Sequence, residues 1–252
     1  MKRWIKAFLN FFLKPNCPLC SRPAEICFCD DCKIQLDECQ FPPGLRWTKG
    51  IPVFIWGSYD GALKQAIARL KYHNCPEIAQ PLGESLARSW VHTAESTLNQ
   101  LVVVPIPMFA AKQQKRGYNQ AELIARSFCQ VTGLPLKANG LKRIRNTTAQ
   151  HKLSAKQRQN NLNRAFSLGP DFQRGRRGYS VILIDDIFTS GATVKGAIQT
   201  LKRANIPVAG VVAVATTRQP LSSQRPKRDR HSTAAEQITN NQRQMTNDIN
   251  KC

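Results

Sequence analysis

Residues 179–193 read YSVILIDDIFTSGAT, and this stretch decides the fold class. Val181 to Ile184 form a continuous apolar run, which is typical of a parallel strand covered on both faces. Two acids, Asp185 and Asp186, follow where open α/β sheets bind their ligands. Small and hydroxylated residues come next, and residues 192–204 then keep apolar side chains at helical spacing. The stretch predicts an α/β fold in which a strand, a binding loop and a helix follow one another.

The loop after the two acids has the composition of a phosphate site. Its members are Thr189, Ser190, Gly191, Ala192 and Thr193. A loop of this kind at a helix N-terminus directs backbone N–H groups and the positive end of the helix dipole at one point. The adjacent acids can accept hydrogen bonds from sugar hydroxyls. The alternative is a buried strand followed by an ordinary turn, which the paired acids disfavour.

Other segments extend this alternation of strands and helices. We expect helices over 61–71, 119–132 and 192–204, and strands over 101–106, 180–185 and 208–215. Strands that alternate with helices predict a mostly parallel sheet with helices on its faces.

Length and charge narrow the class of protein. The 252 residues are 42% hydrophobic, which suits one globular domain with a small appendage and excludes collagen-like or wholly disordered chains. Lys and Arg number 37 against 16 acids, for a net charge of +21, so an anionic substrate or partner is expected.

Residues 112–177 hold fifteen cations and two acids. This excess suits single-stranded DNA, although its aromatic residues are far apart and a solvated surface is the alternative.

Two features address the compartment. No run approaches the roughly 20 apolar residues of a membrane span, so we expect no integral membrane association. The first thirteen residues predict a short amphipathic helix, packed on the body rather than docked on a membrane, and no signal-peptide cleavage site follows them. Nine cysteines, an odd number crowded near the start, favour a reducing compartment, and we expect the cytoplasm.

Two C-x-x-C pairs indicate a metal site. They are Cys17 with Cys20 and Cys29 with Cys32. Four thiolates make a closed tetrahedral site that suits structural Zn²⁺ and leaves no open position for catalysis. Cys27 stands two residues before Cys29 and could replace it as a ligand.

Composition also predicts the boundaries of the parts. We expect a front helix and double zinc-ribbon-like cysteine module over 1–46, the main domain over 47–217, and a polar tail over 218–252. From about Gln219 the chain has hardly any apolar residues, so we expect disorder there.

The strand, the acid pair and the loop resemble the PRPP-binding motif of type I phosphoribosyltransferases (PRPP is phosphoribosyl pyrophosphate), with Ser190 in place of the commoner second threonine. Further blocks carry the likeness: Tyr59-Asp60-Gly61, Lys71-Tyr72, residues 102–107, Arg116-Gly117-Tyr118-Asn119-Gln120, and the series Arg143, Thr147, Gln150, Leu153, Arg158, Asn161 and Ala165-Phe166. In this order behind a cysteine module, residues 15–217 look like the ComF family of competence-associated proteins, which includes the ComFC and GntX groups.

The resemblance implies a type I phosphoribosyltransferase fold that binds PRPP with Mg²⁺. Asp185 and Asp186 would then bind ribose and stabilise its developing positive charge, and residues 189–193 would hold the 5′-phosphate. The segment after the second strand, from Pro105 to Met108, resembles the pyrophosphate loop.

Three further assignments rest on the same resemblance. Arg116 and Lys71 are the candidate cationic contacts, with a solvated position as the alternative for Lys71. Residues 143–166 correspond to the flexible loop that closes over PRPP. The hood that selects the acceptor varies in such enzymes, and the cysteine module is its candidate here.

Two hypotheses therefore stand. In the first, the protein is an enzyme, or a former enzyme, that transfers phosphoribosyl from PRPP to an acceptor which the sequence does not identify, releases pyrophosphate, and is linked to DNA uptake and natural competence. In the second, it is a non-catalytic competence factor that uses the fold as a scaffold for single-stranded DNA, a competence helicase or a recombination mediator.

Overall fold

A parallel sheet forms the centre of the computed structural model, which describes residues 15–42, 51–93, 100–145, 165–172 and 178–218. Its four strands lie in the order β1-β6-β5-β2, and every neighbouring pair is parallel. The strands are β1 (Val53–Ser58), β2 (Leu101–Pro105), β5 (Ser180–Phe188) and β6 (Val208–Thr216). The expected fold class, an α/β protein with a mostly parallel sheet flanked by helices, is confirmed.

Strand β5 lies inside the sheet because both of its faces are apolar. Val181 and Leu183 pack into the hydrophobic cluster on one face, and Ile182 and Ile184 pack into the cluster on the other. Side chains alternate between the faces along a strand, so a continuous apolar run needs cover on both sides. The carboxyl end of β5 therefore lies between those of its neighbours β6 and β2.

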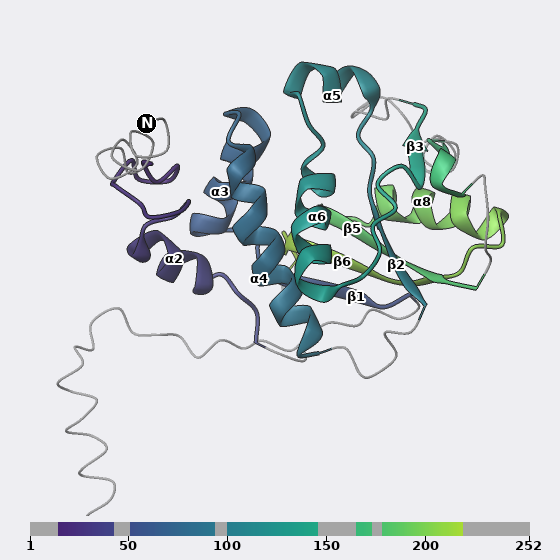
Figure 1. The fold of residues 1–252 in the computed structure, drawn as a ribbon, viewed down its shortest axis with the longest axis horizontal. Coiled ribbons are helices and arrows are strands. Elements are labelled where there is room, and N and C mark those ends of the chain that lie inside the picture. The colour runs from purple at the N-terminus through teal and green to yellow at the C-terminus, as the bar shows by residue number, and fades with distance from the viewer. Residues whose placement is uncertain (1–14, 43–50, 94–99, 146–164, 173–177, 219–252) are drawn as a thin grey trace, which may run out of the picture. The chain divides into compact units, whose positions relative to one another are not determined.

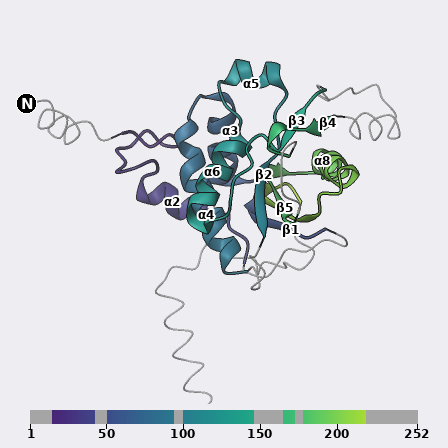
Figure 2. The same cartoon turned by 45° about the vertical axis from the view of Figure 1, so that its right-hand side comes forward.

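Helices supply that cover (Figures 1 and 2). The face of Ile182 and Ile184 packs against α3 (Gly61–Tyr72), α4 (Ala79–Val91) and α6 (Gln120–Thr132). The other face packs against α8 (Ala192–Arg203). Two short strands, β3 (Leu141–Arg143) and β4 (Phe166–Leu168), form a separate antiparallel pair. Helix α5 (Ala110–Arg116) and the 3₁₀ turns η1 (Pro76–Ile78) and η2 (Pro170–Phe172) complete these elements.

The six elements predicted from the sequence are all present, and each matches its predicted range at one end and differs by one to three residues at the other. The largest difference is in β5, which continues through Asp185 and Asp186 to Phe188. The two acids therefore lie within the paired strand. Strand β1 and helix α4 were not among the expected elements.

Residues 15–42, here called the cysteine segment, pack directly on the domain that contains the parallel sheet. Its helix α2 (Asp30–Asp37) contributes Leu36 to the cluster that contains Leu63 of α3. The following residues pair with β1: the N–H of Phe41 donates to the carbonyl of Trp56 at 2.9 Å, and that of Ser58 to Cys39 at 2.9 Å. A Cβ at Gly57 would lie 2.5 Å from the Cys39 carbonyl oxygen, so glycine permits this approach. The division of the chain near residue 46 stays a prediction.

Several expectations lie outside the described residues: the amphipathic helix over the first thirteen residues, most of the closing loop, and the polar tail after Arg218. Among the helices that the structure does describe, none combines the length and the apolar character needed to cross a membrane.

Candidate functional site

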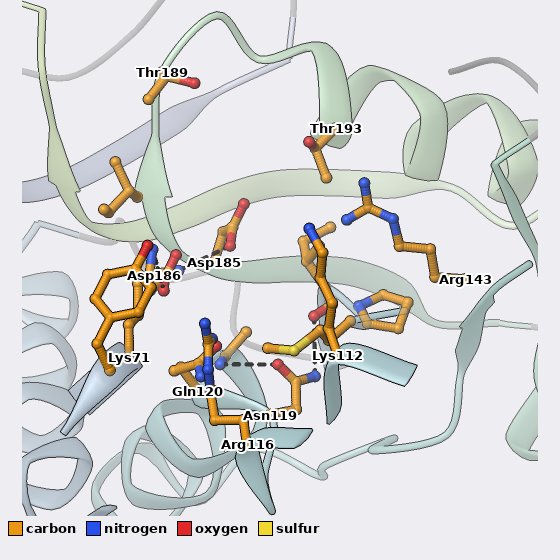
Figure 3. A pocket seen from close by; sticks show the side chains of 16 residues that line it. Lys71, Lys112, Arg116, Asn119, Gln120, Arg143, Asp185, Asp186, Thr189 and Thr193 are labelled. Atoms are coloured by element: carbon orange, nitrogen blue, oxygen red, sulfur yellow. Dashed lines mark hydrogen bonds and ion pairs between the residues drawn. The ribbon is translucent and has the colours of Figure 1, made fainter. Parts of the chain in front are cut away.

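A pocket of about 320 Å³ lies at the carboxyl edge of the sheet. Strand β5 supplies its acids, α3 and α5 supply cations, and the starts of α6 and α8 face it. In Figure 3, Thr189 and Thr193 lie on one side of the pocket and Arg116, Asn119 and Gln120 on the other, with Asp185 and Asp186 between them. The pocket thus has an acidic floor between two helix N-termini.

The two acids occupy different surroundings because neighbouring side chains of a strand point to opposite faces. Asp186 is buried, and its Oδ2 lies 2.8 Å from Nζ of Lys71 at the end of α3. Asp185 accepts a hydrogen bond from the N–H of Asp186 at 2.9 Å. Burial, followed by the charge of Asp186, raises the pKa of Asp185 to about 8, against the opposing effect of Lys71. Lys71 thus lines the pocket as the ion-pair partner of Asp186, and the alternative of a fully solvated position does not hold.

The hydroxylated loop joins β5 to α8 as the sequence predicts. Gly191 caps α8 with a φ of 74°, and Oγ of Ser190 accepts from the N–H of Ala192 at 3.4 Å. Thr189 and Thr193 line the pocket, whereas the side chain of Ser190 is exposed to solvent. The first turn of α8 can therefore present its N–H groups to an anion in the pocket.

The segment that follows β2, predicted as Pro105 to Met108, lines the pocket from Ile106 onward, and Pro105 is outside it. Pro105 is buried and pairs with Ile184 in the sheet, and it does not line the pocket. Ile106 donates its N–H to the Ile184 carbonyl at 2.8 Å, and Pro107 and Met108 then form part of the wall. The pyrophosphate-loop assignment of this segment stays a prediction.

Cations from three separate elements meet at the pocket. Arg116, at the end of α5, lies with its guanidinium carbon 5.6 Å from the centre of the Tyr72 ring. Lys112 of α5 and Arg143 of β3 join it there. Burial lowers the pKa of Arg143, while the charge of Asp185 opposes that effect. With Lys71, four cations face two carboxylates, so the pocket favours an anionic ligand.

The N-terminus of α6 is a site feature that sequence reasoning did not assign. Asn119 caps the helix: its Oδ1 accepts from the N–H of Ala121 at 3.2 Å, and its Nδ2 donates to the Ile106 carbonyl at 3.1 Å. Gln120 is only 3% exposed and lines the pocket, and its Nε2 has no acceptor within the described part of the chain. Tyr118 donates its hydroxyl to the Leu70 carbonyl at 2.7 Å and holds this turn beside Lys71. The signal was the capping asparagine directly before Gln120.

The four cysteines of the two C-x-x-C pairs come together. The Sγ atoms of Cys17, Cys20, Cys29 and Cys32 lie within 4.8 Å of one another and could hold a metal ion. Cys29 caps α2, so the second pair lies at a helix N-terminus. Cys27 is outside this cluster, and burial raises the pKa of its thiol to about 12. Its role as an alternative ligand stays open to test.

Arg22 supports the cysteine cluster electrostatically. Its Nε donates to Sγ of Cys20 at 3.4 Å, and its Nη1 pairs with Asp31 at 2.6 Å. The guanidinium lowers the pKa of the Cys20 thiol to about 6, which favours the thiolate that a metal needs.

Known proteins place the chain in a family. No protein-family model matches the sequence. Competence protein F of Haemophilus influenzae is 32% identical over 166 residues, which cover 64% of this chain and 69% of that protein. The chain belongs to the ComF family. The chain described here is also 29% identical to the DNA utilization protein YhgH of Escherichia coli K12 over 194 residues, which are 74% of this chain and 84% of YhgH. Competence protein ComFC of Bacillus subtilis is 26% identical over 187 residues, with 73% and 70% of the two chains covered.

Solved structures similar to this ComF chain include two phosphoribosyl-transfer enzymes. The adenine phosphoribosyltransferase of Leishmania donovani has a TM-score of 0.37 at 11% identity, with 83% of this chain and 92% of that chain covered. The glutamine PRPP amidotransferase of B. subtilis, complexed with ADP and GMP, has a TM-score of 0.35 at 20% identity, with 57% and 27% covered. The sheet order and register, rather than these scores, carry the fold assignment.

Proposed function

We propose that the pocket binds PRPP with Mg²⁺ and that the protein transfers the phosphoribosyl group to an acceptor with release of pyrophosphate. The observation that carries this proposal is the acid pair between two helix N-termini. PRPP carries a phosphate at each end of a ribose, and the pocket has a helix N-terminus on each side with carboxylates between them, so each N-terminus would hold one phosphate group.

Each part of the ligand has partners in the pocket. The first turn of α8, with Thr189 and Thr193, would hold the 5′-phosphate. Arg116, Lys112 and the free amide donor of Gln120 would hold the pyrophosphate. Asp185 and Asp186 would accept hydrogen bonds from ribose hydroxyls and stabilise the positive charge that develops on the sugar as pyrophosphate leaves.

The donor chemistry of the pocket is compatible with Mg²⁺. Carboxylate and phosphate oxygens are the hard ligands that this ion prefers. When bound with PRPP, Mg²⁺ would neutralise charge on the pyrophosphate leaving group. Lys71 pairs with Asp186 and so limits the negative charge that the acids would add beside the leaving group.

Calorimetric titration of PRPP with Mg²⁺ tests this proposal. Wild-type protein should release heat with a 1:1 stoichiometry, and the Asp185→Asn/Asp186→Asn variant should bind at least tenfold more weakly. Glu122→Gln is the matched control, because Glu122 is an acid that pairs with Arg126 outside the pocket. Absence of heat from the wild type at millimolar PRPP would end the proposal.

A second candidate function is binding of single-stranded DNA, directly or with a competence helicase or recombination mediator. Two observations favour it: the relatives are named for competence and DNA utilization, and residues 112–177 hold fifteen cations against two acids. We expect binding that weakens steeply with salt, survives Asp185→Asn/Asp186→Asn, and falls when Lys152, Lys156 and Arg158 become alanine. These three cations lie outside the described residues. Absence of both DNA binding at low salt and a co-purifying protein partner would contradict it.

For the cysteine cluster we propose structural Zn²⁺. Four thiolates within 4.8 Å of one another match the tetrahedral sulfur set that Zn²⁺ prefers. All four positions would be filled by protein, so the ion would stabilise the segment and take no part in catalysis.

A further inference from the structure

A second pocket, of about 300 Å³, lies between the cysteine segment and α4. Its buried walls come from three parts of the chain: Phe28 and Leu36 of the cysteine segment, Trp56 of β1, and Leu82 of α4. It shares no lining residue with the first pocket, at the carboxyl edge of the sheet. It is therefore a separate cavity, formed where the cysteine segment packs on the sheet domain.

Trp56, one of the residues that line this pocket, carries an unsatisfied hydrogen-bond donor. The residue is 2% exposed, and its Nε1 has no acceptor among the residues that the structure describes. The main-chain carbonyl of Trp56 has a partner, because it accepts from the N–H of Phe41. A buried indole usually finds a partner, since a buried donor without one is costly. Because Nε1 itself is covered, a molecule bound in the pocket can supply the missing acceptor after a small shift of the Trp56 side chain or of its neighbours.

The charges that line the pocket balance one another. Two cations, Lys33 and Arg88, face two acids, Asp37 and Glu84. Arg88 pairs with Glu84 at 2.9 Å, and Lys33 pairs with Asp30 at 3.0 Å. This balance contrasts with the first pocket, where four cations face two carboxylates, and it gives an ionic ligand no net attraction.

Size and wall chemistry define the ligand further. A volume of 300 Å³ equals about ten water molecules at roughly 30 Å³ each, enough for one or two rings. The aromatic rings of Phe28 and Trp56 and the aliphatic side chains of Leu36 and Leu82 suit a flat apolar body. We propose that this pocket binds a small, neutral, aromatic molecule whose carbonyl or ring nitrogen accepts a hydrogen bond from Nε1 of Trp56.

Nuclear magnetic resonance of the ¹⁵N-labelled full chain tests the proposal with three probes. Benzamide has the ring, the carbonyl acceptor and no charge; toluene lacks the acceptor; benzoate is the charged counterpart. The chain has four tryptophans, and Trp56→Phe identifies the indole signal of Trp56. Benzamide should shift that signal downfield in a saturable way at millimolar concentration, and should bind about fivefold or more tightly than toluene or benzoate.

Two variants distinguish the binding role of Trp56 from a packing role. Trp56→Phe keeps an aromatic ring but removes the donor, so benzamide affinity should fall about tenfold while toluene affinity is retained. Trp90→Phe is the matched control, because Trp90 packs on Phe128 and does not line the pocket. It should leave benzamide affinity unchanged, as should Asp185→Asn/Asp186→Asn.

If Trp56→Phe does not fold, wild-type protein still decides the question. Nuclear Overhauser contacts from the benzamide ring to the methyl groups of Leu36 and Leu82 would support the proposal. So small a ligand is expected to bind weakly, so the titration runs to about 20 mM benzamide. If none of the indole signals moves over that range, the proposal is overturned. Equal benzamide affinity in the wild type and Trp56→Phe would overturn it as well.

Discussion

Nζ of Lys71 lies 2.8 Å from Oδ2 of Asp186, and the two side chains are 18% and 11% exposed. The ion pair joins the end of α3 to the strand that carries the acid pair. Few waters reach these groups, so each charge depends on the other for its solvation.

Loss of the Lys71 charge should therefore destabilise the protein. Lys71→Met leaves Asp186 as a largely buried carboxylate without this partner, and the free energy of unfolding should fall by roughly 3 kcal/mol. The double variant Lys71→Met/Asp186→Asn should recover most of that loss, because no unpaired charge remains at Asp186. Urea denaturation of the four members of this cycle measures the coupling. A double variant no more stable than Lys71→Met would contradict the interpretation.

The raised pKa of Asp185 predicts a dependence of stability on pH. In the folded protein this pKa is about 8, above its ordinary value of 3.8, so folding favours the protonated form. Protonated Asp185 therefore contributes stability that is fully present below about pH 4 and is lost as the pH rises through 8. Asp185→Asn removes this loss, so its melting temperature should rise relative to wild type between pH 5 and pH 8 without ligand. A difference in melting temperature between Asp185→Asn and wild type that does not change with pH would contradict this prediction.

Replacing Gly191 should weaken ligand binding as well as lower the stability of the folded protein. Gly191→Ala must adopt a φ of 74°, with its Cβ 3.0 Å from the Phe188 ring, which disturbs the loop at the α8 N-terminus. Gly133→Ala is matched in φ, at 71°, but its Cβ meets no atom within 4 Å. The positive φ alone should cost each variant about 1 kcal/mol of stability, and the contact with Phe188 adds to that cost in Gly191→Ala. Calorimetry should show at least a tenfold loss of PRPP affinity in Gly191→Ala alone; similar losses in both variants would argue against an anion site at this loop.

Gln120 should contribute to binding without contributing to stability. Its Nε2 is buried with no acceptor in the described parts of the chain, so Gln120→Leu should leave the melting temperature equal or higher. The same change should weaken the binding of PRPP or of pyrophosphate with Mg²⁺ about tenfold, because a donor to the ligand is lost. Gln120→Glu should weaken it more, since a carboxylate would face the anion. Unchanged affinity in both variants would remove Gln120 from the site.

The cysteine cluster should hold one Zn²⁺ per chain. Cys17→Ser should lower the zinc content and unfold the front module while the sheet stays largely folded, and a chelator should do the same. Cys27→Ser is the matched control, because Cys27 lies outside the cluster, and it should keep its zinc. Elemental analysis of the purified variants measures the content. Full zinc in Cys17→Ser, or its loss in Cys27→Ser, would replace the ligand set proposed here.

Local patterns explain why much of the fold was predictable. The strand, the acids, the loop and the helix of residues 180–203 are contiguous, so their composition alone reveals their order. The two C-x-x-C pairs are likewise local. Helix α4 gave a weaker signal because Pro81 and Gly83 interrupt it. Gly83 is needed there, since a Cβ would lie 2.6 Å from the Ile124 carbonyl oxygen of α6.

Tertiary structure decided which distant residues share the pocket. Lys71, Lys112, Gln120 and Arg143 come from four elements, and their charges and donors converge only because these elements pack together at the carboxyl edge of the parallel sheet. The sequence alone determined the α/β class, the phosphate-type loop and the cysteine pairs, because each is written in neighbouring residues. The ion pair of Lys71 with Asp186, the buried donor of Gln120 and the cavity beside Trp56 depend on packing between segments, which no local pattern encodes.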